Sequence, residues 1–292
     1  MSLDRPWLLA IDIGNTQIVI GVFENETLHS LYRLTSQAGR TADELLPLLE
    51  PLLRPYIGGL RESRRVAIAS VVPALTGPYE EYAERHLGAH PVIVSAALPL
   101  DLEIDVVDPS SVGADRIADA VAAAAMFKLP AIVVDLGTAT TFDVVLPGPR
   151  YAGGVIAPGI VTSAEELFRR AARLARVELR PPRQTVGRTT EESIQSGVLF
   201  GAAAMIDGIV ARIGKDLAIR PTVIATGGLA PVIAPLCRLL GHVEPGLTLH
   251  GIRLIDERTW ARTAGRASRA TRPPGGASRT PKKALRRRSH PS

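Results

Sequence analysis

The sequence predicts an α/β protein with two similar domains that face each other across a central cleft. Short apolar segments alternate with segments of helical periodicity along most of the 292 residues, which is typical of α/β folds. A hairpin-like segment near the start also recurs in the middle of the chain. With 46 % hydrophobic and 22 % charged residues, the chain has enough apolar material for a sizeable core.

The expected elements follow from composition and periodicity. Strands are predicted where short runs of Val, Ile, Leu or Ala are bounded by Gly, Pro, Asn or Asp, namely at residues 7–13, 17–23, 28–34, 65–71, 91–94, 131–135, 141–145, 154–156 and 222–226. Helices are predicted where apolar residues recur every three or four positions, namely at residues 41–53, 79–87, 115–127, 163–174, 190–214 and 231–240.

The internal repeat is more informative than any single element. The segment LLAIDIGNTQIVIGVF resembles AIVVDLGTATTFDVVL at an offset of 123 residues, so that Asp12 aligns with Asp135 and Gly14 with Gly137. In each copy an apolar strand ends in Asp-x-Gly, a Thr-bearing turn follows, and a second apolar strand returns. Two copies of one hairpin predict two related domains, with a boundary near residue 128.

This boundary gives domains at residues 1–128 and 129–256, followed by a basic tail at 257–292. From Arg262 onward there are ten Lys or Arg residues and no Asp or Glu; of the 34 basic residues 24 remain before it, against 29 acidic ones, a formal charge of −5. Because the positive charge lies outside the domains, a nucleic-acid-binding domain is not expected. The tail is rich in Arg, Pro, Gly and Ser, so we expect it to be disordered; polyanion binding through it stays open.

Several classes of protein are excluded by absent motifs. A single cysteine, Cys237, cannot form a disulfide framework and favours a reducing compartment. The apolar stretch at residues 8–13 is interrupted by Asp12, and no run is long enough to span a membrane, so a cytoplasmic protein is expected. The sequence has no G-x-x-x-x-G-K-[ST], no G-x-G-x-x-G opening a helix and no G-x-S-x-G.

The paired Asp-x-Gly turns suit phosphate binding. Glycine allows the backbone to approach phosphate oxygens, and turn amides and threonine hydroxyls can donate hydrogen bonds to them. The aspartates repel phosphate, so they are expected to act through a bound cation. A third glycine turn, TGG at residues 226–228, could accept a flat base or ribose, or could be an ordinary strand-to-helix turn.

A candidate for activating the phosphate acceptor lies in GADR at residues 113–116, where a helix is expected to begin. Asp115 could accept a proton from an attacking hydroxyl, and the Arg116 guanidinium could bind a carboxylate of the acceptor. A purely structural explanation is also open. The helix dipole favours Asp115 in the first turn, and Arg116 could pair with Asp119 one turn later.

A second helix start is predicted at Thr189. Thr189 and Glu192 have the spacing of a capping box, in which the threonine side chain accepts from the backbone three residues on. This structural role accounts for Thr189 and leaves the hydroxyl of Thr190 without an assignment.

Taken together, the motifs DIGNT, GADR, DLGTATT, GGVIAPG and GRTTEESIQSG, at residues 12–16, 113–116, 135–141, 153–159 and 187–197, resemble those of the type III pantothenate kinases. The resemblance runs from about residue 8 to 256. It implies a fold of the acetate-and-sugar-kinase/Hsc70/actin (ribonuclease H-like) type and a homodimer. It also implies ATP-dependent phosphorylation of pantothenate to 4′-phosphopantothenate, the first step of coenzyme A synthesis, with Mg²⁺ and a monovalent cation, potassium or ammonium.

The resemblance also assigns roles by position. It places Asp115 as the proton acceptor and Asp135 as the ligand of the monovalent cation. Thr190 would contact pantothenate from the partner subunit, and Val106 stands in the pantothenate pocket where the family usually has tyrosine. ATP-binding residues would be Asp12, Ile13, Gly14, Asn15, Thr16, Gln17, Ile18, Val19 and Thr138, and pantothenate would be bound by Gly113, Ala114, Asp115 and Arg116 as well.

Two rival functions remain open from the sequence alone. One is a catalytically weak, nucleotide-binding regulator whose basic tail binds nucleic acid, suggested by Val106 and by the tail. The other is a kinase that acts on a different small hydroxy acid.

Overall fold

The computed structural model describes residues 6–171 and 174–270. Its strands are β1 (Trp7–Ile13), β2 (Gln17–Glu24), β3 (Thr27–Thr35), β4 (Val66–Ser70), β5 (Val92–Ile93), β6 (Glu103–Ile104), β7 (Ala131–Leu136), β8 (Ala139–Leu146), β9 (Arg150–Pro158), β10 (Thr222–Thr226) and β11 (His242–Val243). Its α-helices are α1 (Ala42–Leu53), α2 (Ile57–Ser63), α3 (Pro73–Tyr82), α4 (Ala114–Met126), α5 (Ile160–Arg170), α6 (Thr190–Asp216), α7 (Ala230–Ile233) and α8 (Leu247–Ala270).

The strands form two sheets with the same internal order. The first sheet runs β3-β2-β1-β4-β5, and the second runs β9-β8-β7-β10-β11, with β6 added beyond β9. In each sheet three antiparallel strands are followed by two parallel ones. The repeat seen in the hairpins therefore extends to five strands, and the expectation of an α/β protein with two similar domains is confirmed.

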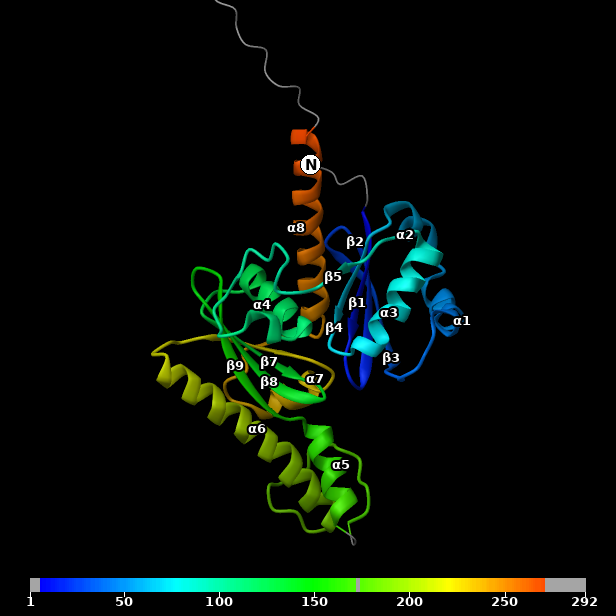
Figure 1. The fold of residues 1–292 in the computed structure, drawn as a ribbon. Coiled ribbons are helices and arrows are strands. Elements are labelled where there is room, and N and C mark those ends of the chain that lie inside the picture. Colours follow the sequence, from blue (N-terminus) through cyan, green and yellow to red (C-terminus); the bar gives the residue numbers. More distant parts are fainter. Residues whose placement is uncertain (1–5, 172–173, 271–292) are drawn as a thin grey trace, which may run out of the picture.

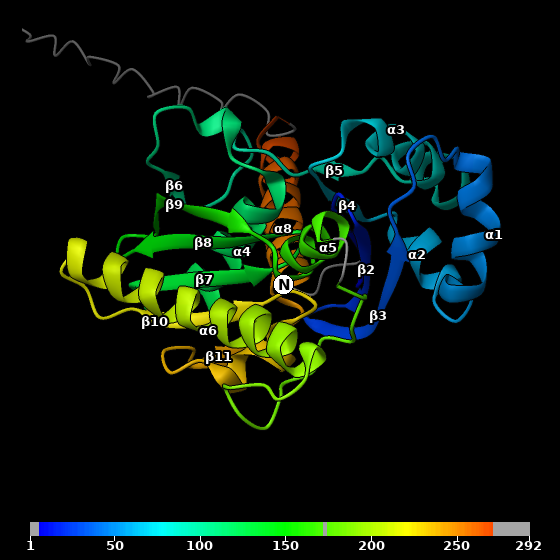
Figure 2. The same cartoon turned by 90° about the horizontal axis from the view of Figure 1, so that it is seen from below.

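Helices α4 and α8 lie between the two sheets, α1 and α3 cover the outer face of the first sheet, and α5 projects from the second sheet beside the start of α6 (Figure 1). The two inner helices approach closely where a Cβ on Gly251 would lie 1.9 Å from the carbonyl oxygen of Ala118, so only glycine fits there. Seen from below, α6 crosses the outer face of the second sheet (Figure 2).

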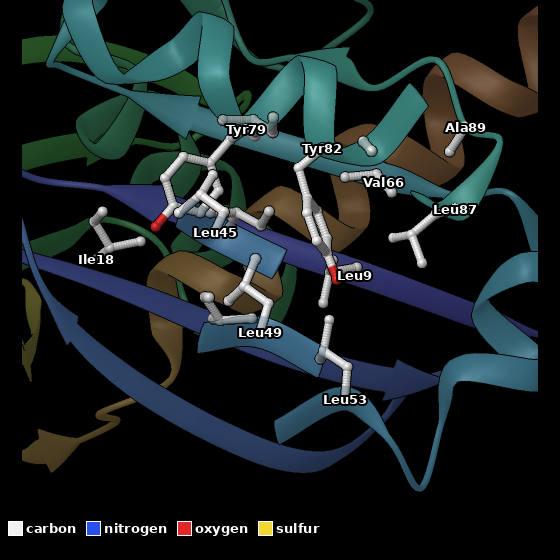
Figure 3. Packing of buried hydrophobic residues seen from close by; sticks show 14 of the residues in the cluster. Leu9, Ile18, Leu45, Leu49, Leu53, Val66, Tyr79, Tyr82, Leu87 and Ala89 are labelled. Atoms are coloured by element: carbon white, nitrogen blue, oxygen red, sulfur yellow. The ribbon is translucent and has the colours of Figure 1, made fainter. Parts of the chain in front are cut away.

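The outer core of the first domain shows how the sequence pattern produces this layering. Tyr79 and Tyr82 of α3 and Leu45 and Leu49 of α1 pack on Leu9 of β1, all fully buried (Figure 3). Alternate residues of β1 face the other way, toward α8, since successive side chains of a strand point to opposite faces. Burial on both faces explains why β1 is a continuous apolar run.

Helix α6 is long and apolar enough to cross a membrane by composition alone. In the structure Leu199, Ile206 and Val210 of this helix are buried against the second sheet, together with Val134 of β7. The helix therefore forms part of the core of the second domain, which explains its composition.

Some elements differ from the predicted ones. Helix α3 begins at Pro73 rather than 79, α7 is a single turn followed by a 3₁₀ turn (Ala234–Leu236), and α2, α8, β6 and β11 were not predicted. Helix α8 includes residues 257–270, the first part of the expected disordered tail; residues 271–292 lie outside the described ranges. The helix is held in place by buried apolar residues and by the buried ion pair between Arg65 and Asp256 (2.7 Å).

The predicted boundary at residue 128 falls between α4 and β7. Two segments cross it, because β6 joins the second sheet and α8 returns to pack on the first. These exchanged segments place α4, which carries the GADR motif, against elements of both sheets.

Candidate active site

The turns of the two repeated hairpins meet between the sheets, and we call the exposed surface around them the cleft. The hydroxyl of Thr16, in the β1–β2 turn, lies 2.8 Å from the hydroxyl of Thr138, in the β7–β8 turn. Both side chains are exposed to solvent. The two expected phosphate-binding turns are therefore in contact, although these threonines are 122 positions apart in the chain.

The second turn is one residue shorter than the first. The last paired residues are Ile13 with Ile18 in the first hairpin and Leu136 with Thr140 in the second. The sequence offset of 123 therefore holds up to the turns and becomes 122 on the returning strands. By this register the partner of Asp12 across the hairpin is Val19, and that of Asp135 is Thr141.

Glycines keep the backbone closed around the second turn. A Cβ on Gly159 would lie 2.1 Å from the carbonyl oxygen of Thr138, which explains the glycine of the GGVIAPG motif. Gly227 has a φ of +87°, and a Cβ there would lie 2.4 Å from Oδ1 of Asp135. Any other residue at 227 would displace the aspartate, so this glycine fits the strand-to-helix turn and the Asp135 carboxylate together.

Three carboxylates share the cleft beside these turns. Burial raises the pKa of Asp12 well above its usual range, and the like charges of Asp115 and Asp135 raise it further. Burial, with the charges of Asp115 and Asp143, raises the pKa of Asp135 to about 7. Like charges held this close in a low-dielectric site favour a bound cation, which would offset their repulsion.

The residues expected to bind ATP divide into two groups. Asn15, Thr16 and Gln17 are exposed at the turn, where side chains and amides are accessible. Ile13 and Ile18 are buried in the first core, so only their backbone groups could reach a nucleotide.

Asp115 lies in the first turn of α4, two residues after the N-cap Gly113. Its Oδ1 accepts a hydrogen bond from the backbone N–H of Arg116 (2.8 Å). Burial raises the pKa of Asp115, although this hydrogen bond and the Arg116 charge partly oppose the rise. A carboxylate with a raised pKa at a cleft is suited to accept a proton from a substrate.

Arg116 does not pair with Asp119 as the structural explanation from the sequence required. Its guanidinium lies 2.7 Å from Oδ1 of Asp143 on β8, a carboxylate that is fully buried. Asp119 turns to the other inner helix, where it accepts a hydrogen bond from the hydroxyl of Thr248 (2.7 Å). The partner of Arg116 therefore comes from the second sheet, 27 residues along the chain.

Val106 lies partly buried beside β9. It packs in the cluster that contains Tyr151 of β9, and its Cγ1 lies 3.7 Å from the Cβ position of Gly153. Tyr151 is buried and donates a hydrogen bond from its hydroxyl to Asp143 (2.8 Å). Sequence reasoning missed both Asp143 and Tyr151; the signal was an aspartate inside the otherwise apolar strand TFDVVL.

Thr190 lies far from these residues within one chain. It begins α6, after Thr189, whose side chain accepts from the Glu192 amide (3.1 Å), as the predicted cap requires. This end of α6 projects beside α5, away from α4 (Figure 1). Between the two helices is an apolar groove of about 720 Å³, whose lining includes Thr190 and, among apolar residues, Ile160, Leu167, Ile194, Val198 and Met205.

No group of three or more His, Cys, Asp or Glu side chains in the described ranges could hold a metal ion alone. This suits Mg²⁺ in a nucleotide site, since that ion is usually held by one or two carboxylates together with substrate phosphates and water. Asp12, at the end of β1 beside the first turn, is placed to supply such a carboxylate.

These features define the class of protein: a two-domain fold of the acetate-and-sugar-kinase/Hsc70/actin type with a cleft between repeated hairpins. Two solved structures share this fold. One, from Campylobacter jejuni, is named for the Baf family of transcriptional activators (TM-score 0.54, 19 % identity, covering 85 % of this chain and 97 % of that one). The other is the activator of 2-hydroxyisocaproyl-CoA dehydratase from Clostridium difficile with bound ADPNP (TM-score 0.53, 12 % identity, covering 92 % and 100 %).

The chain belongs to the type III pantothenate kinase family. The family model matches residues 8–212. A type III pantothenate kinase of Streptomyces griseus is 45 % identical over 265 residues, covering 87 % of this chain and 99 % of that protein. One from Thermomicrobium roseum is also 45 % identical, over 251 residues, covering 86 % and 97 %. The family expected from the motifs is confirmed.

Proposed function

We propose that this protein phosphorylates pantothenate with ATP to give 4′-phosphopantothenate and ADP, the first step of coenzyme A synthesis. The observation that carries the proposal is the contact between Thr16 and Thr138, which joins the two turns beside Asp115. Phosphate-binding turns and a proton acceptor therefore share one cleft, in a chain of the type III pantothenate kinase family.

The reaction requires little covalent chemistry from the protein. The primary hydroxyl oxygen of pantothenate attacks the γ-phosphorus, a new P–O bond forms, and the bond from the γ-phosphorus to the bridging oxygen of ADP breaks. Asp115 accepts the hydroxyl proton as its oxygen becomes nucleophilic. Its burial disfavours the charged form, so the raised pKa makes the carboxylate a better proton acceptor than an exposed aspartate.

The two turns orient the triphosphate. Backbone amides and the hydroxyls of Thr16 and Thr138 donate to phosphate oxygens from both sides of the cleft. Mg²⁺ and a monovalent cation, potassium or ammonium, supply positive charge that offsets the negative charge developing on the transferred phosphoryl group. Asp135 is the residue we assign to the monovalent cation, and Asp12 faces the same site from the first turn.

The acceptor is held by Gly113, Ala114 and Arg116 at the start of α4, with Val106 on the apolar wall. We infer that Thr190 reaches pantothenate from a partner subunit in a homodimer, because in its own chain it lies away from α4. The apolar groove between α5 and α6 supports such an interface. Sedimentation analysis should give a dimer; an active monomer would contradict this assignment. The enzyme is expected in the cytoplasm.

The test is ADP release by the purified protein with ATP, Mg²⁺ and pantothenate, in potassium and in sodium buffers, with the product identified by mass spectrometry. We expect pantothenate-dependent turnover that is faster in potassium and a product heavier by one phosphoryl group. Turnover without pantothenate, or none with it, would contradict the proposal. Across the described residues, nothing favours the rival regulator that binds nucleic acid.

A further inference from the structure

The carboxylate of Asp143 is the most heavily hydrogen-bonded acidic group near the cleft. Its Oδ1 accepts from Nε (2.8 Å) and an Nη (2.7 Å) of Arg116 and from the hydroxyl of Tyr151 (2.8 Å). Its Oδ2 accepts from the hydroxyl of Thr141 (3.0 Å). With its side chain fully buried, Asp143 cannot itself contact a ligand in the cleft.

These contacts fix one edge of the Arg116 guanidinium. The group lies over the Tyr151 ring, 5.9 Å from its centroid. A Cβ on Gly154 would lie 2.0 Å from the carbonyl oxygen of Phe142 and 2.8 Å from Nη2 of Arg116, so only glycine fits in the strand behind the guanidinium. An arginine side chain normally loses considerable entropy when it binds a ligand. Because the Arg116 side chain is already ordered by these contacts, this entropy loss on binding is smaller.

The opposite edge of the guanidinium remains available. Nη1 of Arg116 forms no hydrogen bond with any described residue, and the side chain keeps 17 % of its exposure. A guanidinium can bind two carboxylates at once, one on each edge, because its donors lie in a plane. Asp143 occupies the inner edge, which leaves the outer edge for an anionic ligand.

A second buried pair shows what a purely structural arrangement looks like. Nε and Nη2 of Arg65 donate to Oδ2 of Asp256, at 2.8 and 2.7 Å, and both side chains are 4 % exposed. This pair ties β4 to α8. The bond lengths match those of Arg116 and Asp143, but only Arg116 retains an exposed portion next to the carboxylate assigned as proton acceptor.

We propose that Asp143, supported by Tyr151, is a positioning residue that holds Arg116 with its free edge toward the carboxylate of the acceptor. The inference rests on the proposed function and refines it. Asp143 acts through Arg116, so it should control how strongly the enzyme prefers an anionic acceptor over a neutral one, with little effect on ATP.

The experiment compares steady-state kinetics with pantothenate and with its neutral amide, in which the carboxylate is replaced. In Asp143→Asn we expect the KM for pantothenate to rise about 10-fold or more, because small misplacements of a binding group have effects of that size. The KM for ATP and the kcat/KM for the amide should change by less than about threefold. Tyr151→Phe, which removes one hydrogen bond to Oδ1, should give the same selective loss at a few-fold.

Asp256→Asn is the matched control, because it breaks a buried pair of the same geometry outside the site. It should lower the thermal unfolding midpoint without changing the preference for pantothenate over the amide. Equal losses for both acceptors in Asp143→Asn, or an unchanged preference there, would overturn the proposal. If that variant does not fold, an unchanged preference in Tyr151→Phe overturns it. Failure of the native protein to phosphorylate pantothenate would contradict the proposed function instead.

Discussion

The two repeated hairpins use the same face of the same structure for different purposes. By the register of the hairpins, Gly21 on β2 and Asp143 on β8 occupy equivalent positions, each two residues beyond the partner of the turn aspartate. Gly21 lies against Leu249 of α8, where a Cβ would come within 2.8 Å of the leucine side chain. Asp143 instead meets Arg116 of α4.

This difference shows how a duplicated unit acquires two functions. In the first domain apolar side chains of α8 cover the inner face of the sheet, and the turn residues Asn15, Thr16 and Gln17 are exposed. In the second domain the inner face carries a buried polar network that reaches α4. We therefore expect the first hairpin to serve ATP alone, and the second to serve both ATP and the acceptor.

The largest effect is expected when the first hairpin is given the aspartate that the second hairpin has at the equivalent position. Gly21→Asp would bury a carboxylate against the side chains of Leu249, Leu28 and Phe23, so we expect a loss of about 3–5 kcal/mol in the free energy of unfolding. Gly21→Ala is the control, since the Cβ meets side chains of Leu249, Leu28 and Phe23 and no backbone atom. Chemical denaturation measures the free energy of unfolding of both variants. Equal stabilities of Gly21→Asp and Gly21→Ala would contradict the expectation that a buried carboxylate at this position needs polar partners like those of Asp143.

Ionised Asp135 should destabilise the folded protein, because it is buried near the carboxylates of Asp115 and Asp143. Its folded pKa, about 7, lies above the value near 3.9 of an unfolded chain, so the folded state disfavours the ionised form. This destabilisation is largest above pH 7 and diminishes as the pH falls from 7 toward 4.

Asp135→Asn should therefore raise the unfolding midpoint of the ligand-free protein, more at pH 8 than at pH 5. In the same variant, activity should fall about 100-fold and lose its potassium dependence, because the carboxylate that we assign to the monovalent cation is gone. Calorimetry at both pH values and kinetics in potassium and sodium check this. A variant that is less stable at pH 8 and still responds to potassium would contradict it.

The smallest expected effect tests whether the two turns contribute equally to ATP binding. Thr16→Val and Thr138→Val each remove one hydroxyl of the same 2.8 Å contact, so each should raise the KM for ATP about fivefold, the value of one hydrogen bond. Because the two hydroxyls touch, the double variant should lose less than the product of the single effects. Additive losses would indicate that the threonines act independently.

The elements with local signals could be predicted from sequence. The repeated hairpins are short apolar strands around Asp-x-Gly turns, and the caps at Thr41 and Thr189 follow from a glutamate three residues on. Helix α2 was missed because the glycines of IGGLRES obscure its periodicity. Helix α8 was missed because its buried Ile252 and Ile255 lie among many charged residues.

Contacts at the active site were harder to predict from the sequence than the elements were. The local rule paired Arg116 with Asp119, one helical turn away, whereas the fold supplies Asp143 from a strand. No local pattern could reveal that contact, because it depends on how α4 is placed on the second sheet. The separation of Thr190 from Asp115 within one chain likewise became evident only in three dimensions.

The central claim is that Asp115 accepts the proton of the pantothenate hydroxyl in the cleft between the two hairpins. The most direct test is pantothenate-dependent ADP release by the native protein and by Asp115→Asn, at saturating ATP, Mg²⁺ and potassium, with nucleotide binding and thermal unfolding measured in parallel. We predict that kcat falls by about 100-fold or more while the variant stays folded and binds ATP. Turnover near the native rate in Asp115→Asn would contradict the account.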